Sequence, residues 1–266
     1  MIHLISPENA HLYGEEIKGI HRARKAVFVD ELRWNLSVVD GMEFDEYDDE
    51  RTCNVVGFSV EGEVVMGMRF RPTDDRSMLV DHFSHVLPED TRPINDSKTW
   101  ELSRGFSLER GVRRHNLRRK AACMIAPLEI ALQSGIDRCV GFTDVRMLSF
   151  CYGVGWNLEL LGTPVPYDEG EAVAYEIEVS EANLARMRKM WGLPQPSYID
   201  IQALGAGDAT VHDAASRLLD VRPELGKFAP QPEEDVTPIS AARSERPKEY
   251  YDSFATLDNS PVRKVS

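Results

Sequence analysis

The spacing of apolar and polar positions changes several times along the chain, and each spacing predicts a kind of element. Apolar residues that recur every three or four positions predict helices with one buried face, and short runs rich in β-branched residues predict strands. Helices are expected over 12–32, 117–132, 145–154 and 181–191. Strands are expected over 53–60, 64–71, 99–108, 137–143, 158–161 and 172–179, with a short helix or irregular apolar segment over 78–86.

The order of these elements predicts an α/β fold built on one mixed central sheet flanked by helices. The turn Glu61-Gly62-Glu63 predicts a hairpin between the first two strands, and the chain lacks the repeated strand–helix units of a doubly wound fold. The segment 106–119, where a strand leads into an Arg-rich helix, resembles an arrangement found in N-acetyltransferases. In those enzymes a helix N-terminus binds the phosphates of the cofactor. An acetyltransferase-like (GNAT-related) fold is therefore expected.

The composition changes after about residue 194, and this change divides the chain. Residues 208–221 have the pattern of one helix, and six prolines with many charges follow from Pro223 onward. A segment of that composition has too few apolar residues to bury a core. We therefore expect one folded domain over 1–199 and an extension over 200–266, which would hold one helix followed by a disordered tail.

Charged residues interrupt apolar sequence at several places, and three of them, Arg69, Glu101 and Arg104, lie within predicted strands. Each alone is typical of the surface or of a structural ion pair, but buried charges cost several kcal/mol each unless they are paired. Three arginines and three carboxylates form the set and could satisfy one another: Arg24, Asp45, Asp48, Arg69, Glu101 and Arg104. A regular strand would point Glu101 and Arg104 to opposite faces. A bulge near 103–105, or separate partners on the two faces, is therefore required.

The net charge and the cysteines narrow the class of protein. The 266 residues carry a formal net charge of −13, so nucleic acid is not expected as the main partner, because phosphate binding needs a cationic surface. The four cysteines are widely spaced and form no metal pattern with the seven histidines, which predicts reduced, mostly buried thiols. Neither a secretion signal nor an apolar run of about 18 residues is found. We expect a cytoplasmic protein without a membrane span.

A concentrated group of cations stands out against this acidic background. It comprises Arg110, Arg113, Arg114, Arg118, Arg119 and Lys120, with no acid among them. A solvated helix face explains such a group as well as a docking site for a phosphate or an acidic protein does. The segment 113–118 lacks the glycines of the usual acetyltransferase phosphate loop, which weakens an interpretation based on coenzyme A.

Aromatic and hydroxyl side chains supply a second group of candidates. Several aromatic residues could line a pocket or simply fill the core: Phe28, Trp34, Phe83, Trp100 and Phe142. Thr143, at the end of a predicted strand, could hydrogen-bond a ligand or cap the next helix. Ser103 has no histidine and aspartate in a hydrolase motif, so a serine hydrolase is not expected.

A series of short motifs runs through the first 156 residues. The motifs are Arg24-x3-Phe28-x5-Trp34, Asp45-x2-Asp48, Gly67-x-Arg69-x2-Pro72-Thr73, Phe83, Trp100-Glu101-x-Ser103-Arg104, Thr143, Met147-Leu148 and Gly155-Trp156. Each motif alone is weak, but the whole series in this order and spacing is specific. Over about residues 1–195 the chain resembles the acyl-homoserine-lactone synthases, which make the autoinducers of bacterial quorum sensing.

The resemblance implies an acetyltransferase-like catalytic domain and a two-step reaction. The α-amine of S-adenosylmethionine attacks the thioester of an acyl chain on acyl carrier protein. The methionine carboxylate then closes a lactone and expels methylthioadenosine. The resemblance makes Glu101 the first candidate for the base that takes the proton of the amine. The other charged residues would order an N-terminal lid and hold the sulfonium substrate: Arg24, Asp45, Asp48, Arg69 and Arg104.

The same resemblance assigns the remaining candidates. Phe28 and Trp34 would cover S-adenosylmethionine, with an aromatic–cation contribution. Further substrate-binding residues would be Phe83, Ser103, Phe142 and Thr143, and a threonine at the last position accompanies 3-oxo-acyl products in this family. Acyl carrier protein, or acyl-CoA in its place, would be the acyl donor, and the carrier protein would dock on Arg113, Arg114, Arg118, Arg119 and Lys120. S-adenosylmethionine is a substrate, so no cofactor is expected.

Two departures from the family and two alternatives remain. Tyr152-Gly153 occupy positions where basic residues often precede the Gly155-Trp156 motif, and 200–266 has no counterpart in a typical member. A coenzyme A-dependent N-acyltransferase of the same fold is one alternative. A non-catalytic module that binds an acyl ligand or a protein is the other.

Overall fold

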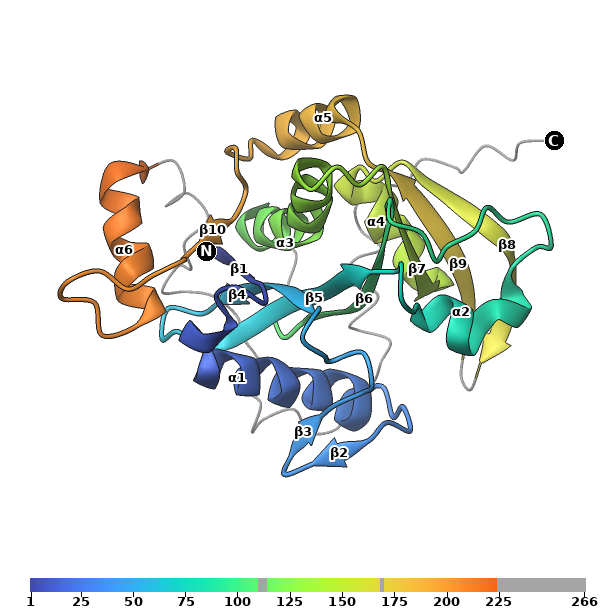
Figure 1. Cartoon of the computed structure of the whole chain (residues 1–266), viewed down its shortest axis with the longest axis horizontal. Coiled ribbons are helices and arrows are strands. Elements are labelled where there is room, and N and C mark those ends of the chain that lie inside the picture. The colour runs from blue at the N-terminus through green and yellow to red at the C-terminus, as the bar shows by residue number, and fades with distance from the viewer. Residues whose placement is uncertain (110–113, 168–169, 224–266) are drawn as a thin grey trace.

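A mixed β-sheet forms the centre of the molecule (Figure 1). The structure, a computed structural model, describes residues 1–109, 114–167 and 170–223. Within these ranges the sheet has eight strands in the order β10-β1-β4-β5-β6-β7-β9-β8. Neighbours are antiparallel except for two parallel pairs, β1 with β10 and β6 with β7. The strands are β1 (Ile2–Ile5), β4 (Cys53–Phe58), β5 (Val64–Pro72), β6 (Thr99–Ser107), β7 (Arg138–Asp144), β8 (Leu158–Tyr167), β9 (Gly170–Glu178) and β10 (Ile199–Asp200).

Helices cover both faces of this sheet, so the predicted mixed α/β architecture is confirmed (Figure 1). One face carries α3, α4 and α5, the other carries α1 and α2, and α6 lies at the β10 end. A separate hairpin of β2 (Val38–Val39) and β3 (Met42–Glu43) lies beside α1. The helices are α1 (Gly14–Arg24), α2 (Met78–Phe83), α3 (Arg114–Gln133), α4 (Leu148–Val154), α5 (Glu181–Trp191) and α6 (Val211–Val221).

The ends of the helices follow local signals in the sequence. The side chain of Ser180 accepts a hydrogen bond from the backbone N–H of Asn183, which caps the start of α5. Gly155 and Gly192 adopt φ of 101° and 64°, the left-handed conformation that ends α4 and α5. These signals explain why the boundaries predicted for both helices agree closely with the structure.

Two predicted elements differ from the structure in a way that physical reasoning explains. The helix expected over 12–32 begins as α1 and continues as a π-helical stretch, Lys25–Glu31, whose wider turns change the direction of the side chains. The strand expected over 158–161 continues to Tyr167 as β8. This strand forms the edge of the sheet and most of its residues are exposed or half-buried, so it lacks the apolar alternation that predicts a strand.

The central strand β6 contains the bulge that the sequence requires. Gly67 of β5 pairs with Phe106, and Arg69 pairs with Ser103, so β6 has one residue more than β5 between these pairs. Arg104 takes up the extra residue with a left-handed φ of 51°, which is uncommon for any residue except glycine. The predicted bulge near 103–105 is confirmed.

The strands β6 and β7 diverge part-way along their length. They pair in parallel from Thr99 and Arg138 to Leu102 and Gly141, and not beyond. Past this point β6 continues to pair with β5, and β7 with β9. We call this divergence the split of the sheet.

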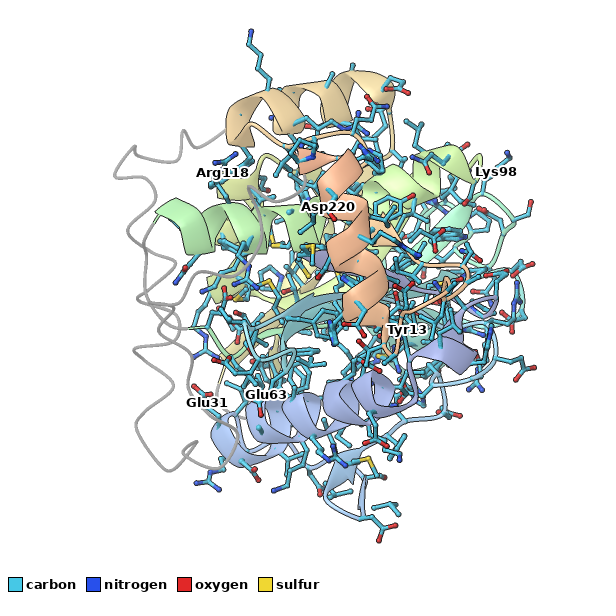
Figure 2. All side chains as sticks on the ribbon, turned by 90° about the vertical axis from the view of Figure 1, so that its left-hand side faces the viewer. Tyr13, Glu31, Glu63, Lys98, Arg118 and Asp220 are labelled. Carbon is cyan, nitrogen blue, oxygen red and sulfur yellow. The ribbon has the colours of Figure 1, made fainter. Side chains whose placement is uncertain are left out.

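Residues from the predicted extension complete a second hydrophobic core at the β10 end. Ile201, Val211 and Ala214 are buried together with Ile5 and Ile20. Figure 2 faces this end and shows α6 running between α5 and α1. The helix lies within the range 208–221 predicted for it, whereas β10 crosses the predicted boundary at 199. The division into a domain and an extension stays a prediction, and 224–266 lie outside the described residues.

Two further expectations concern the environment of the chain. Cys123, Cys139 and Cys151 are buried and Cys53 is half-buried, all as free thiols, so the prediction of mostly buried thiols is confirmed. In the part of the chain that the structure describes, none of the helices combines the length and the apolar character needed to cross a bilayer. The cytoplasmic location stays a prediction.

Candidate active site

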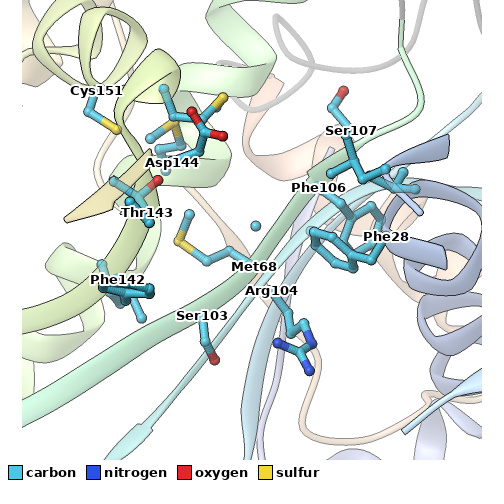
Figure 3. Close-up of a pocket in the computed structure, with 18 of the residues that line it drawn as sticks. Phe28, Met68, Ser103, Arg104, Phe106, Ser107, Phe142, Thr143, Asp144 and Cys151 are labelled. Atoms are coloured by element: carbon cyan, nitrogen blue, oxygen red, sulfur yellow. The ribbon is translucent and has the colours of Figure 1, made fainter. Parts of the chain in front are cut away.

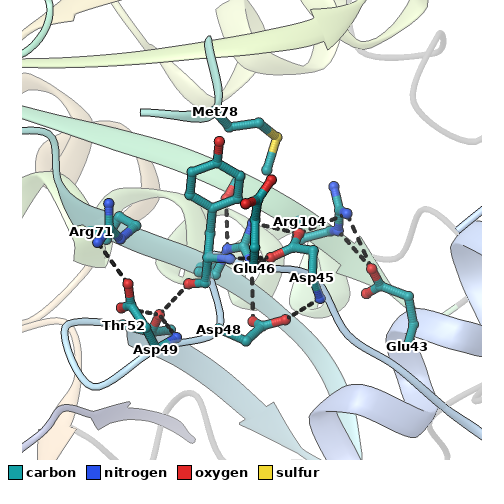
Figure 4. Close-up of polar contacts among 12 residues, drawn as sticks. Glu43, Asp45, Glu46, Asp48, Asp49, Thr52, Arg71, Met78 and Arg104 are labelled. Atoms are coloured by element: carbon teal, nitrogen blue, oxygen red, sulfur yellow. Dashed lines mark hydrogen bonds and ion pairs between the residues drawn. The ribbon is translucent and has the colours of Figure 1, made fainter. Parts of the chain in front are cut away.

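Three arginines, two of them buried and Arg104 half-buried, form one ionic network with three carboxylates at the C-terminal end of α1. Figure 4 shows the three carboxylates together with Arg104. Arg24 donates to Asp48 at 2.7 and 2.9 Å. Arg69 donates to Asp48 at 2.9 Å and forms two hydrogen bonds with Asp45. Arg104 pairs with Asp45 at 2.8 Å. Five of the six predicted charged residues therefore meet in one place, although α1, the loop over 44–52 and the sheet supply them separately.

The third carboxylate of this network is Glu43, not the predicted Glu101. Glu43 is completely buried, and it pairs with Arg24 at 2.5 Å and with Arg104 at 3.1 Å. The expectation that Glu101 balances the three arginines is wrong, because Glu101 points to a different partner. Glu43 is one of many acids between residues 40 and 50, and only its position on β3 beside α1 distinguishes it.

The paired charges shift the protonation equilibria of both aspartates in the same direction. Burial alone would raise the pKa of Asp48, but the hydrogen bonds from Arg24 and the charges of Arg24 and Arg69 outweigh burial and lower the pKa. The pKa of Asp45 is lowered for the same reasons, with Arg69 and Arg104 as its partners. Both side chains are therefore anions at neutral pH, and they hold the loop over 44–52 against the sheet.

Glu101 is buried on β6 and bound to backbone N–H groups instead of to arginine. Its Oε2 accepts the N–H of Met78 at 2.7 Å, and its Oε1 accepts the N–H of Leu79 at 2.7 Å. These donors belong to the first turn of α2. Burial raises the pKa of the carboxyl, although the two hydrogen bonds and the charge of Arg69 act in the opposite direction. A carboxylate with a raised pKa is a better proton acceptor than an exposed one.

The bulge decides how the charged residues of β6 are presented. Ser103 accepts a hydrogen bond from Nε of Arg69 at 2.9 Å, and Arg104 reaches Glu43 and Asp45 in the same network. Figure 3 shows the side chains of Ser103 and Arg104 leaving the strand on the same side. Without the extra residue, neighbouring side chains would point to opposite faces.

A cavity of about 410 Å³ adjoins this network and reaches through the split of the sheet (Figure 3). Residues past the split line it from both strands, from Ser103 to Ser107 and from Phe142 to Asp144. The wall on the side of the ionic network includes Phe28, Trp34, Phe83, Glu101 and Arg104. The wall on the side of α3 and α4 includes Met124, Phe150, Cys151, Trp156 and Tyr175.

Two stacked aromatic pairs form opposite walls of the cavity. The rings of Phe28 and Trp34 lie 5.1 Å apart and nearly parallel, and Arg104 lies over the face of Phe28 at 5.8 Å. The rings of Phe83 and Phe142 lie 4.5 Å apart. Figure 3 shows Phe28 and Phe142 on opposite sides of the cavity. The structure therefore places all four of these predicted residues at one site.

The end of β7 provides polar groups at the same cavity. Thr143 lines it, and the neighbouring Asp144 caps the following helical turn by accepting the N–H of Arg146 at 2.8 Å. The capping role considered for Thr143 therefore belongs to Asp144. The hydroxyl of Tyr167 on β8 donates to Asp144, and its ring meets Trp34 edge to face at 6.3 Å.

Comparison with known proteins places this arrangement in a family. The family described as autoinducer synthase matches residues 8–187. The isovaleryl-homoserine lactone synthase of Bradyrhizobium diazoefficiens is 32% identical over 196 residues, which is 73% of this chain and 87% of that protein. The chain belongs to the autoinducer synthase family. It is an acyl-homoserine-lactone synthase, an N-acyltransferase that produces a quorum-sensing signal.

Other relatives of the synthase agree with this assignment. An acyl-homoserine-lactone synthase of Agrobacterium fabrum is 26% identical over 188 residues, covering 69% of this chain and 88% of that protein. The solved structure of BjaI, described as a CoA-dependent acyl-homoserine lactone synthase with SAM and isopentyl-CoA, has a TM-score of 0.68 and 29% identity. That likeness covers 82% of this chain and 99% of BjaI. The predicted α/β fold with one mixed central sheet is confirmed, and the synthase shares it with BjaI.

The predicted docking surface of the synthase needs correction. Arg119 and Lys120 are buried, so neither can form part of an exposed patch. Arg119 donates to Glu109 and to the carbonyl of Phe58, and Lys120 donates to the carbonyl of Glu109 at 3.0 Å. They stabilise the entry to α3 from inside. Unbroken positive charge in a sequence does not reveal that a helix face is turned inward.

The other predicted docking residues of the synthase have different positions. Arg118 is half-buried and donates to the carbonyls of Trp191 and Gly192, at 2.9 and 3.1 Å, which ties α3 to the end of α5 (Figure 2). Arg114 begins α3, and Arg113 lies outside the described residues. For Arg113, Arg114 and Arg118 the docking role stays a prediction.

Proposed function

We propose that the synthase transfers an acyl group from a coenzyme A thioester to the α-amine of S-adenosylmethionine and then closes the lactone. The cavity through the split supports this proposal most directly. It joins a buried ionic face, which suits a charged amino acid substrate, to an apolar wall, which suits an acyl chain. Glu101 lies where the two meet and is not neutralised by an arginine.

The reaction balances without any further reagent. The substrate ammonium gives one proton to Glu101, and its nitrogen attacks the thioester carbonyl carbon. The new C–N bond forms as the C–S bond breaks, and the departing thiolate takes the second proton of the nitrogen. A carboxylate oxygen of the methionyl group then attacks the γ-carbon of the same group, which is bonded to the sulfonium sulfur. A C–O bond forms, a C–S bond breaks, and neutral methylthioadenosine leaves while the two opposite charges cancel.

The remaining site residues position the substrates in this proposal. The network of Arg24, Asp45, Asp48, Arg69 and Arg104 fixes the segment that carries the stacked pair Phe28 and Trp34. That pair would cover the sulfonium substrate, because aromatic faces attract cations. Ser103, Phe83, Phe142 and Thr143 line the part of the cavity where the thioester would lie. Two reactants held in this way react as if at high local concentration.

The choice of acyl donor is the second part of the proposal. Two of the five cations expected to contact a carrier protein are buried. This weakens the argument that an exposed positive surface binds an acidic carrier protein. BjaI, with which the synthase shares its fold over most of both chains, is described as CoA-dependent. Acyl carrier protein, the donor implied by family resemblance, remains the competing candidate.

Release of methylthioadenosine from S-adenosylmethionine and acyl-CoA tests the reaction. Loss of a general base typically costs 10²- to 10⁴-fold in rate, so we expect Glu101→Gln to lose at least about 100-fold in kcat. Wild-type turnover by Glu101→Gln would contradict the assigned base. Acyl transfer to other amines without S-adenosylmethionine would favour an ordinary N-acyltransferase, and binding of S-adenosylmethionine without product would favour the non-catalytic module.

A direct competition tests the donor. The same acyl group is supplied on coenzyme A and on acyl carrier protein, and kcat/KM is measured for both. We expect the coenzyme A thioester to have the higher kcat/KM. A higher value for the carrier protein would overturn this part of the proposal, and Arg114→Ala and Arg118→Ala would then show whether the remaining cations form the dock.

A further inference from the structure

Two polar groups lie in the apolar wall of the cavity, on the side of α3 and α4. They are the indole N–H of Trp156, just after α4, and the hydroxyl of Tyr175 on β9. Both residues are at least nine-tenths buried, with exposed fractions of 3% and 5%. Their rings lie 5.9 Å apart and both line the cavity, so one ligand can contact both residues.

Neither group is satisfied by the protein within the described ranges. Nε1 of Trp156 is buried without a hydrogen-bond partner. Tyr175 lines the cavity, and its hydroxyl forms no hydrogen bond with the residues described. Nearly all buried donors in proteins have a partner, because an unpaired one is costly. Phenylalanine would fill the same space at either position without that cost. An acceptor that enters the cavity would explain why these residue types are present.

The backbone around Tyr175 leaves space for its hydroxyl. Gly141 of β7 pairs with Tyr175 of the neighbouring strand β9. A Cβ at Gly141 would lie 2.5 Å from the hydroxyl oxygen of Tyr175 and 2.9 Å from the carbonyl oxygen of Leu102. Only glycine therefore allows the hydroxyl to lie at the split. Burial raises the pKa of Tyr175, so the hydroxyl keeps its proton and can donate.

These groups lie on the opposite face of the sheet from the ionic network. Leu102 and Tyr175 belong to the core formed with α3 and α4, whereas the neighbouring Glu101 belongs to the other face. An acyl chain whose thioester lies near Glu101 would cross the split and continue between Met124, Phe150 and Trp156. We propose that Trp156 and Tyr175 bind an oxygen atom on this distal part of the acyl group, beyond its third carbon.

This inference rests on the proposed function and names the class of acyl donor within it. The synthase would prefer acyl groups that carry a distal hydroxyl or carbonyl over alkyl groups of equal length. A site built to hydrogen-bond a substrate oxygen discriminates strongly against an analogue that lacks it, because the site is then left with unpaired donors. Thr143 also lines the cavity, on β7, where it shares a face of the strand with Gly141.

The test compares pairs of coenzyme A thioesters from hexanoyl to decanoyl, each with and without a terminal hydroxyl, together with their 3-oxo counterparts. We expect at least one hydroxylated member to exceed its parent about tenfold in kcat/KM, measured by methylthioadenosine release. In Trp156→Phe and Tyr175→Phe this ratio should fall several-fold. Phe150→Leu, which changes the same wall without removing a polar atom, should keep the ratio. A purely structural role for Trp156 would lower both members of each pair equally.

Three results would overturn the inference. They are equal or higher kcat/KM for every unsubstituted parent, a preference confined to the 3-oxo thioesters, and a terminal-hydroxyl preference that Trp156→Phe and Tyr175→Phe both retain. The proposed function fails differently, since no thioester of either kind would then release methylthioadenosine. Normal thermal unfolding of each variant confirms that the ratios come from folded enzyme.

Discussion

At the scale of single residues, the most informative side chain is Glu101, whose two oxygens both accept backbone N–H groups from α2. A glutamine at this position would point its amide NH2 at one of these N–H groups. Glu101→Gln is therefore not structurally silent, and we expect it to lose about 1–3 kcal/mol of stability in addition to activity. Denaturant unfolding separates the two effects, because the surviving folded fraction can be assayed on its own.

The raised pKa of Glu101 predicts the pH dependence of the reaction. A general base must be deprotonated, so kcat/KM should fall as the pH drops through the pKa of Glu101. Burial raises that pKa, so this acid limb should lie above the ordinary glutamate value of about 4.3. A pH–rate profile measures it, with Glu101→Gln as the control that lacks the limb. An identical limb in the glutamine variant would contradict the assignment.

Asp48 makes a different prediction because it bridges two buried arginines. Asp48→Asn leaves Arg24 with Glu43 and Arg69 with Asp45 but removes one of the three negative charges that balance the arginines, and we expect a stability loss of about 3 kcal/mol. The lowered pKa of Asp48 means that its contribution is complete above the unfolded value of about 3.9 and is lost as the pH falls further. Urea unfolding at several pH values measures both. Glu15→Gln, which removes an exposed pair with Lys18, should change little.

At the scale of elements, the split between β6 and β7 depends on glycine at a crowded position. Gly141→Ala would place a Cβ against the carbonyl of Leu102 and the hydroxyl of Tyr175, so the strands must shift. We expect a stability loss of about 1–3 kcal/mol and a narrower cavity. Thermal unfolding and kcat/KM for a long and a short acyl thioester measure the two effects. Equal activity losses for both chain lengths would contradict the narrowing.

The bulge shows how far element-level prediction from sequence can go. The period-two rule placed Glu101 and Arg104 on opposite faces and therefore required either a bulge or separate partners on the two faces, and the structure has a bulge at Arg104. The same rule could not say that Glu101 binds α2 instead of arginine. The π-helical stretch Lys25–Glu31 left no signal, since its apolar residues also fit an ordinary helix. The periodicity of a segment predicts which face of an element a side chain lies on. Which residue that side chain binds depends on contacts between segments that are distant in the sequence.

At the scale of the whole molecule, α6 contributes to the second core. Ala214 is buried on this helix and Ser216 is exposed. Ala214→Asp places a carboxylate in that core, and we expect a clear drop in melting temperature, because an unpaired buried charge is strongly unfavourable. Ser216→Asp adds the same charge at the exposed position and should leave the melting temperature nearly unchanged. Equal melting temperatures would show that α6 is dispensable for the fold.

Much of the fold and of the ionic network could be predicted from the sequence, whereas the exposure of several charged residues could not. The hairpin, the long helix and the five arginine and aspartate residues of the network were predictable, because buried charges within apolar runs demand partners. Glu43 was not, since nothing local separates it from the neighbouring acids. The burial of Arg119 and Lys120 was missed because charge in a sequence does not show which way a helix face points.

The position of the cavity in the split has a consequence for the order of events during turnover. S-adenosylmethionine and the thioester are expected to meet on the ionic face, and only the acyl tail crosses to the other face of the sheet. In the product, the ring on the ionic face is joined to a tail that lies between β6 and β7. The tail has to be withdrawn through that passage as a whole. Longer tails should therefore slow departure more than they slow bond formation.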